Sequence, residues 1–134
     1  MLHAMLVHTR AARLVAEALF LDEEGHSPSA AELDWLEQDL ADFVQQSGAW
    51  TRLLLGACMT VVILLVPWFA RQPRSLGGLP VEARRAALER MEESDLSLPF
   101  LAVKAALCLV HYEHPAAAAR VGFDGRCASG RERR

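Results

Sequence analysis

Histidine and carboxylate side chains gather in the stretch HYEHPAAAARVGFDG, residues 111–125. His111, Glu113 and His114 are residue types that bind metal ions or transfer protons, and the two histidines have a spacing that places them near one helical face. A metal site needs three or four ligands, however, and the carboxylate-bridged sites of helical bundles use Glu-x-x-His on two helices. The alternative is a polar helix end, where histidine interacts favourably with the helix dipole. We favour the polar helix end.

Other residues able to perform catalysis lack the pattern that each reaction needs. Glu23 and His26 have the Glu-x-x-His spacing but lie in an expected loop, and His3 and His8 have no ligand spacing. The sequence contains no Gly-x-Ser-x-Gly elbow, no dinucleotide-binding Gly-x-Gly-x-x-Gly and no P-loop. We therefore expect this chain to hold no catalytic residue, cofactor or metal of its own.

The N-terminal part of the chain has the periodicity of two helices. Apolar residues recur at helical spacing over residues 3–21. A second amphipathic helix begins either after Ser27–Pro28 or after Ser29, which forms a capping box with Glu32. Gly48 is expected to end this helix. Acidic residues occupy its polar face.

The C-terminal part predicts further helices. Residues 80–94 follow a proline and carry an apolar stripe, whereas residues 99–112 are apolar on nearly all sides and predict a core helix. A His-Pro pair ends that helix, and residues 116–120 form a last helical turn. The sequence thus predicts an all-α bundle of five to six helices around one very apolar central helix. It occupies a single domain at 1–125, with a basic, disordered tail at 126–134.

Residues 53–70 form an uncharged run of eighteen residues. As a helix this run is about 27 Å long, slightly shorter than the ~30 Å hydrocarbon core of a bilayer. One alternative is a membrane-spanning or membrane-dipping helix with Trp50 and Trp68 near its ends, as interfacial tryptophans are placed. The other is a helix buried on all sides by its own domain or by a partner. We favour the buried helix, because the bundle otherwise lacks a central element.

Composition and charge restrict the class of partner. Apolar residues make up 52% of the 134 residues, and the mean hydropathy is +0.14, which is high for a small soluble domain. Residues 14–51 hold nine acids and no Lys or Arg, and only the last nine residues are strongly basic. These features argue against nucleic-acid binding and indicate apolar surface that faces a partner or a bilayer.

The N-terminal sequence and the three cysteines bear on cellular location and on thiol chemistry. The N-terminus has no recognisable secretion signal, so a cytoplasmic or membrane-associated protein is expected. Cys58, Cys108 and Cys127 have neither the number nor the spacing of a disulfide framework or a zinc site.

The C-terminal half carries a dispersed motif. It consists of a Leu-x-x-x-x-Arg segment, a helix, a second apolar helix with one basic residue, an aromatic turn, a proline and a Gly-aromatic-x-Gly ending. These positions are Leu79, Arg84, Leu88, Ser94, Lys104, Tyr112, Pro115, Gly122, Phe123 and Gly125. Residues 76–125 thereby resemble the small helical module that accompanies glucose–methanol–choline (GMC) type flavin oxidoreductases. The family carries it as a separate small subunit, as in gluconate and glucose dehydrogenases, or fused ahead of the flavin domain in long-chain alcohol oxidases.

The resemblance implies a noncatalytic small subunit. Such a module packs on a larger FAD-binding subunit, stabilises it and shapes the entrance for an alcohol, sugar or sterol hydroxyl, while the flavin and the catalytic base belong to the partner. The chain departs from the family in lacking a twin-arginine signal. The expected interface residues are Tyr112, His114, Pro115, Arg120 and Phe123, together with Trp68 and Phe69. The competing hypothesis is a single-pass or membrane-embedded adaptor built around residues 53–70.

Overall fold

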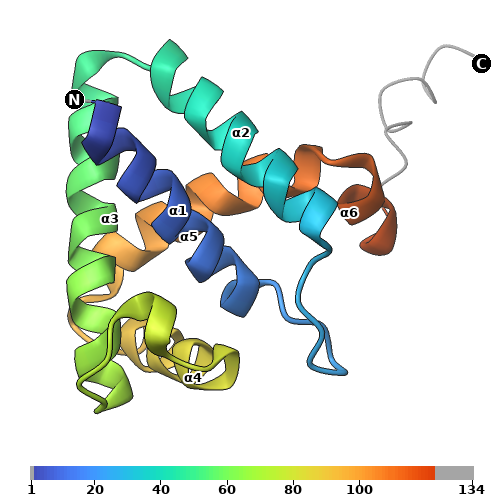
Figure 1. Cartoon of the computed structure of the whole chain (residues 1–134). Coiled ribbons are helices and arrows are strands. Elements are labelled where there is room, and N and C mark those ends of the chain that lie inside the picture. The colour runs from blue at the N-terminus through green and yellow to red at the C-terminus, as the bar shows by residue number, and fades with distance from the viewer. Residues whose placement is uncertain (1, 123–134) are drawn as a thin grey trace, which may run out of the picture.

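The computed structural model describes residues 2–122, with side chains from His8 onward (Figure 1). These residues form six α-helices and a short 3-10 helix, and the described range contains no strand. The elements are α1 (Leu2–Leu19), α2 (Ala30–Gln46), α3 (Ala49–Ala70), η1 (Leu76–Gly78), α4 (Val81–Glu92), α5 (Ser97–Glu113) and α6 (Pro115–Arg120). The predicted all-α bundle of five to six helices is confirmed. Phe123 and the tail predicted at 126–134 lie outside the described residues.

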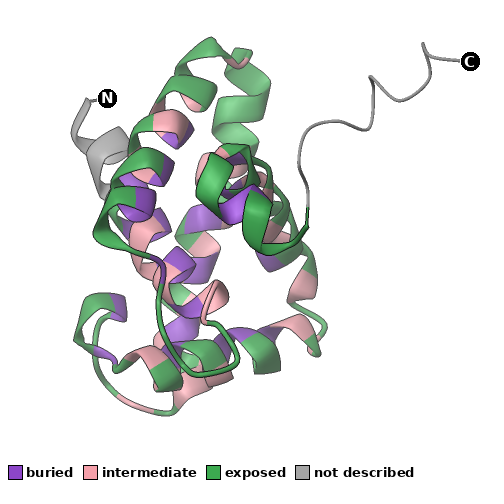
Figure 2. Ribbon diagram, turned by 90° about the vertical axis from the view of Figure 1, so that its right-hand side faces the viewer, coloured by how far each residue is buried: buried purple, intermediate pink, exposed green. Residues whose placement is uncertain are grey.

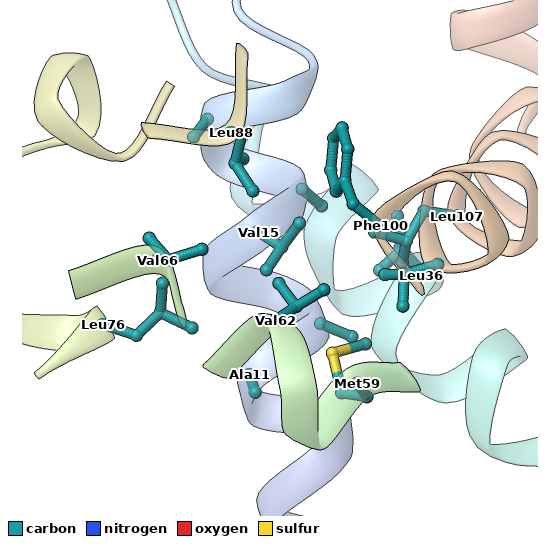
Figure 3. Packing of buried hydrophobic residues seen from close by; sticks show 14 of the residues in the cluster. Ala11, Val15, Leu36, Met59, Val62, Val66, Leu76, Leu88, Phe100 and Leu107 are labelled. Carbon is teal, nitrogen blue, oxygen red and sulfur yellow. The ribbon is translucent and has the colours of Figure 1, made fainter. Parts of the chain in front are cut away.

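One hydrophobic core joins five of the helices. Fully buried side chains from different elements meet there, as Figure 3 shows for Val15 of α1, Leu36 of α2, Val62 of α3 and Phe100 and Leu107 of α5. In Figure 1, α3 runs along one edge of the molecule; the C-terminal end of α2 meets its N-terminal end, and α4 packs near its C-terminal end. The apolar helix therefore contributes to the core from an edge of the bundle.

Local sequence explains where α2 begins and ends. Of the two alternatives for its start, the structure has Ser29 as N-cap, and its hydroxyl accepts a hydrogen bond of 3.2 Å from the backbone N–H of Glu32. The helix ends at Gln46, and the Ser47 hydroxyl donates to the carbonyl of Phe43 at 2.7 Å. Gly48, predicted to end α2, directly follows the C-cap Ser47 and is also the N-cap of α3.

α3 is not buried on all sides within this chain. Met59, Val62 and Val66 are buried on the face toward the bundle, whereas most residues of the opposite face are exposed. Its C-cap is Arg71, which has a left-handed backbone with φ of 57°. The described residues contain one helix, α3, that is long and apolar enough to span a membrane. Figure 2 shows the same division in the bundle as a whole, with buried residues on the faces turned toward neighbouring helices.

Candidate interaction surfaces

The histidines at the end of α5 point to different helices. His111 is buried, and its ring stacks on Phe20, which directly follows α1, with centroids 3.9 Å apart and planes at 14°. His114 is the N-cap of α6, where Nδ1 accepts from the N–H of Ala116 at 3.2 Å, and its ring meets Trp35 of α2 edge-on at 5.3 Å. Each ring thus has a packing role between helices.

The surroundings of these histidines do not assemble a metal centre. Burial lowers the pKa of His111, which keeps the ring neutral. A hydrogen bond with Asp39 of α2 raises the pKa of Glu113, so this carboxylate lies against a second acid. Among the side chains that the structure describes, from His8 to Gly122, no three His, Cys, Asp or Glu are placed to hold one ion.

Two of the predicted interface residues, Pro115 and Arg120, belong to α6. Pro115 occupies the first turn of α6, where its missing N–H costs nothing. The guanidinium of Arg120 donates to the carboxylate of Glu32, which is buried at 5% exposure. The capping-box glutamate therefore reaches across to α6, and Arg120 compensates its buried charge.

Tyr112 opens onto a groove. Its ring is 40% exposed and meets Phe20 edge-on at 6.0 Å. The groove has a volume of about 270 Å³ and lies between the end of α1, α4 and α5, with Phe100, Lys104 and Cys108 also in its wall. Lys104 donates to Glu92 at 2.8 Å there. Burial raises the pKa of the Cys108 thiol, so the groove holds no activated nucleophile at this position.

Residues of the Leu-x-x-x-x-Arg motif lie inside the bundle. The side chain of Arg84 is 7% exposed, donates to the carbonyls of Leu79 at 3.2 Å and Leu14 at 2.7 Å, and pairs with Glu17 at 3.3 Å. It ties α4 and the preceding loop to α1. Folding accounts for this arginine, and no partner is needed to explain it.

α5 has an exposed apolar face. Leu98, Leu101, Leu109 and Tyr112 are 76%, 41%, 65% and 40% exposed and share one side of the helix, because they are spaced by 3, 8 and 3 residues. Exposed alanines lie between them. We call this the α5 outer face, defined as Leu98, Leu101, Ala102, Ala105, Leu109 and Tyr112. The opposite side is in the core, so the sequence prediction of a core helix holds for one face of α5.

α3 has a second, bulkier face of the same kind. Trp50, Leu53, Leu54, Leu64 and Trp68 are between 55% and 75% exposed, and their spacing places them on one side of the helix. We call this the α3 outer face, defined as Trp50, Leu53, Leu54, Ala57, Leu64 and Trp68. It begins and ends with tryptophan over about 27 Å of helix.

A shallow pocket adjoins the C-terminal end of the α3 outer face. Its volume is about 410 Å³, and it is lined by Trp68, Phe69, Arg71 and Arg90. The two rings meet edge-on at 5.1 Å, and Arg90 Nη1 donates to the carbonyl of Phe69 at 2.9 Å. Of the predicted interface residues, Trp68 and Phe69 thus lie at the other end of the bundle from His114 and Arg120.

Comparison of the chain with protein-family models, curated proteins and solved structures finds no match. The described residues thus form a helical bundle with two exposed apolar faces, one on α3 and one on α5.

Proposed function

We propose that this chain is a noncatalytic small subunit that packs on a larger FAD-dependent oxidoreductase of the GMC type. The observation that carries the proposal is the α5 outer face, a row of exposed leucines that ends at Tyr112. Exposed leucines on one helix lower solubility in water and are expected where another protein covers them. The resemblance of residues 76–125 to the accessory module of these enzymes supports the class of partner.

The composition of the α5 outer face favours a protein over a lipid as its partner. Ala102 and Ala105 are exposed between the leucines and allow another backbone to approach closely. Asp95 precedes the helix and Glu113 ends it, so acidic groups flank both ends of the face. Acids at these positions repel an anionic membrane surface but can pair with basic groups of a protein.

In this proposal the two subunits have different roles. The partner provides the FAD and the catalytic base for oxidising an alcohol, sugar or sterol hydroxyl. This chain supplies buried apolar area, with Tyr112 as an aromatic anchor at the end of the face. The groove beside Tyr112 accepts a side chain of the partner, and the cover thus formed shapes the substrate entrance.

The test is affinity purification of the tagged chain from its native host, with an absorbance scan of the eluate. We expect a larger second band and the absorbance bands of a flavin in stoichiometric amount. The variant Leu98→Ser/Leu109→Ser should lose the flavoprotein, whereas Leu53→Ser/Leu64→Ser on α3 should retain it. A colourless eluate from the unchanged chain, or equal loss with both variants, contradicts the proposal.

A second candidate function is a single-pass membrane adaptor in which α3 crosses the bilayer, which its length and composition allow. Crossing withdraws Met59, Val62 and Val66 from the core and exposes their partners to water, at about 1.5–3 kcal/mol for each large side chain. Resistance of the whole chain to extraction by alkaline carbonate would support this candidate, and release into the soluble fraction would exclude it.

A further inference from the structure

The ends of the α3 outer face carry residues that suit a membrane surface. Trp50 and Trp68 are 75% and 69% exposed, the two most exposed aromatic side chains given for the described residues. Tryptophan concentrates at the boundary between lipid headgroups and acyl chains, because its ring is apolar and its N–H is polar. Leu53, Leu54 and Leu64 provide acyl-chain contacts between the two rings.

The charge around this face has the opposite sign to that of the chain. Between Asp42 and Glu82 the sequence contains Arg52, Arg71 and Arg74 and no Asp or Glu, whereas the whole chain has a net charge of −3. The acids of α2 and α4 begin only beyond this segment. The arginines of this segment complement the surface of an anionic bilayer. The α5 outer face, which has acids at both ends, does not.

The pocket at Trp68 provides a place for a headgroup. Arg71 and Arg90 line it beside the rings of Trp68 and Phe69, so that guanidinium groups and apolar carbon border the same hollow. The hydrogen bond from Arg90 to the carbonyl of Phe69 fixes one side of this wall. Guanidinium binds phosphate oxygens strongly, while the rings accept the glycerol and upper acyl carbons.

We infer that the α3 outer face binds the surface of an anionic phospholipid bilayer, with α3 in the plane of the membrane and a headgroup phosphate at Arg71 and Arg90. The in-plane orientation follows from the two sides of the helix, since Met59, Val62 and Val66 remain in the core while only the outer face meets lipid. In Figure 1 this helix forms an edge of the molecule that no other described helix covers on the outside. The inference does not rest on the flavoprotein partner, which contacts α5.

The experiment is flotation of the purified full chain with two kinds of vesicle, one of phosphatidylcholine alone and one of equal parts phosphatidylcholine and phosphatidylglycerol. We expect flotation with the mixed vesicles and much weaker flotation with phosphatidylcholine. Leu53→Ser/Leu64→Ser should bind mixed vesicles about tenfold or more weakly. Arg71→Gln/Arg90→Gln should lose roughly fivefold for each arginine on mixed vesicles only.

The matched control is Leu98→Ser/Leu109→Ser, which removes two leucines of similar exposure from α5 and should leave flotation unchanged. Helical circular dichroism shows that each variant is folded, and alkaline carbonate should release the bound chain from the vesicles. Four outcomes overturn the inference: no flotation of the folded chain with either vesicle, equal loss in the α5 control, resistance to carbonate, or a dimer that the α3 variant dissociates and that does not float. Because flavin capture is measured separately, failure here is distinguishable from failure of the proposed function.

Discussion

α2 and α3 are neighbouring helices that face the core in the same way and face outward in opposite ways. α2 buries Leu33, Leu36 and Leu40, and acids dominate its other side. α3 buries Met59, Val62 and Val66, and large apolar side chains dominate its other side. Both helices thus contribute apolar side chains to the same core, although their outer sides differ in character.

This difference separates folding from binding. The outer side of α2 is polar, as is typical of the solvent-exposed side of a helix in a soluble bundle. The α3 outer face contributes little to the core, because its leucines and tryptophans are more than half exposed. The core does not need these apolar residues, and the described residues form no metal centre. We therefore interpret the exposed apolar residues as surfaces that bind other molecules.

The largest effect on stability is expected from one kind of substitution, leucine to alanine, made on the inner side of α2 and on the outer side of α3. Leu36→Ala empties a fully buried position of α2 and should lower the free energy of unfolding by about 3–4 kcal/mol. Leu64→Ala, at a position that is 68% exposed, should change it by less than about 0.5 kcal/mol. Urea unfolding followed by circular dichroism measures both. Comparable losses would erase the distinction between the two sides.

A somewhat smaller loss is expected from an interior polar contact. Arg84→Met removes the donor to the carbonyls of Leu14 and Leu79 and leaves the 23%-exposed Glu17 without its ion pair. We expect a loss of about 2–3 kcal/mol in the free energy of unfolding, since the pair is partly screened by water. Arg85→Met is the control, because Arg85 is exposed and pairs with the exposed Glu89 one turn away. An unaffected Arg84 variant would show that this motif residue serves a partner instead.

The pH dependence of stability tests the buried ring at the end of α5. Burial lowers the pKa of His111, the charge of Glu32 opposes this, and Arg120 and His114 lower it further. The folded chain therefore binds fewer protons than the unfolded chain, so the contribution is fully present above the unfolded pKa of about 6.5 and is lost as pH falls below it. Urea midpoints should decrease on acidification in this window, and His111→Gln should flatten that decrease. An identical slope in the variant would assign it to other groups.

The smallest effect is expected at the C-cap of α3. Arg71 has φ of 57°, a conformation that favours glycine. Arg71→Gly should raise the free energy of unfolding by about 0.5–1 kcal/mol while weakening flotation with anionic vesicles. Arg74→Gly, in the following loop, should not stabilise the chain. If Arg71→Gly destabilises the bundle, the arginine is retained for folding and not for a ligand.

The helices were predictable because their start and stop signals are local. Ser29 caps α2, the proline at position 80 precedes α4, and the His114–Pro115 pair separates α5 from α6, as their residue types indicate. Gly48 marks the end of α2 as its residue type indicates, but its second role as the N-cap of α3 does not follow from the residue alone. Such signals concern a few adjacent residues and need no tertiary information.

The faces of the helices were only partly predictable. Residues 53–70 and 99–112 are apolar nearly all round, so periodicity does not show which side packs inward, and their total apolar content suggested burial on all sides. The interior role of Arg84 and the contact between Arg120 and Glu32 join segments distant in sequence. Of the residues expected at a partner interface, Tyr112 and Trp68 lie on exposed faces, while His114 and Arg120 also serve packing within the chain. Their contact with a partner stays a prediction.

The most direct test of the account is the unfolding free energy of one variant that polarises both outer faces, with Leu53, Leu64, Leu98 and Leu109 all replaced by serine. These four leucines are between 64% and 76% exposed, so the variant should remain helical, gain solubility and keep its free energy of unfolding within about 1 kcal/mol of the unchanged chain. Loss of more than about 3 kcal/mol, or of the helical fold itself, would contradict the account, because it would mean that the chain needs these faces to fold.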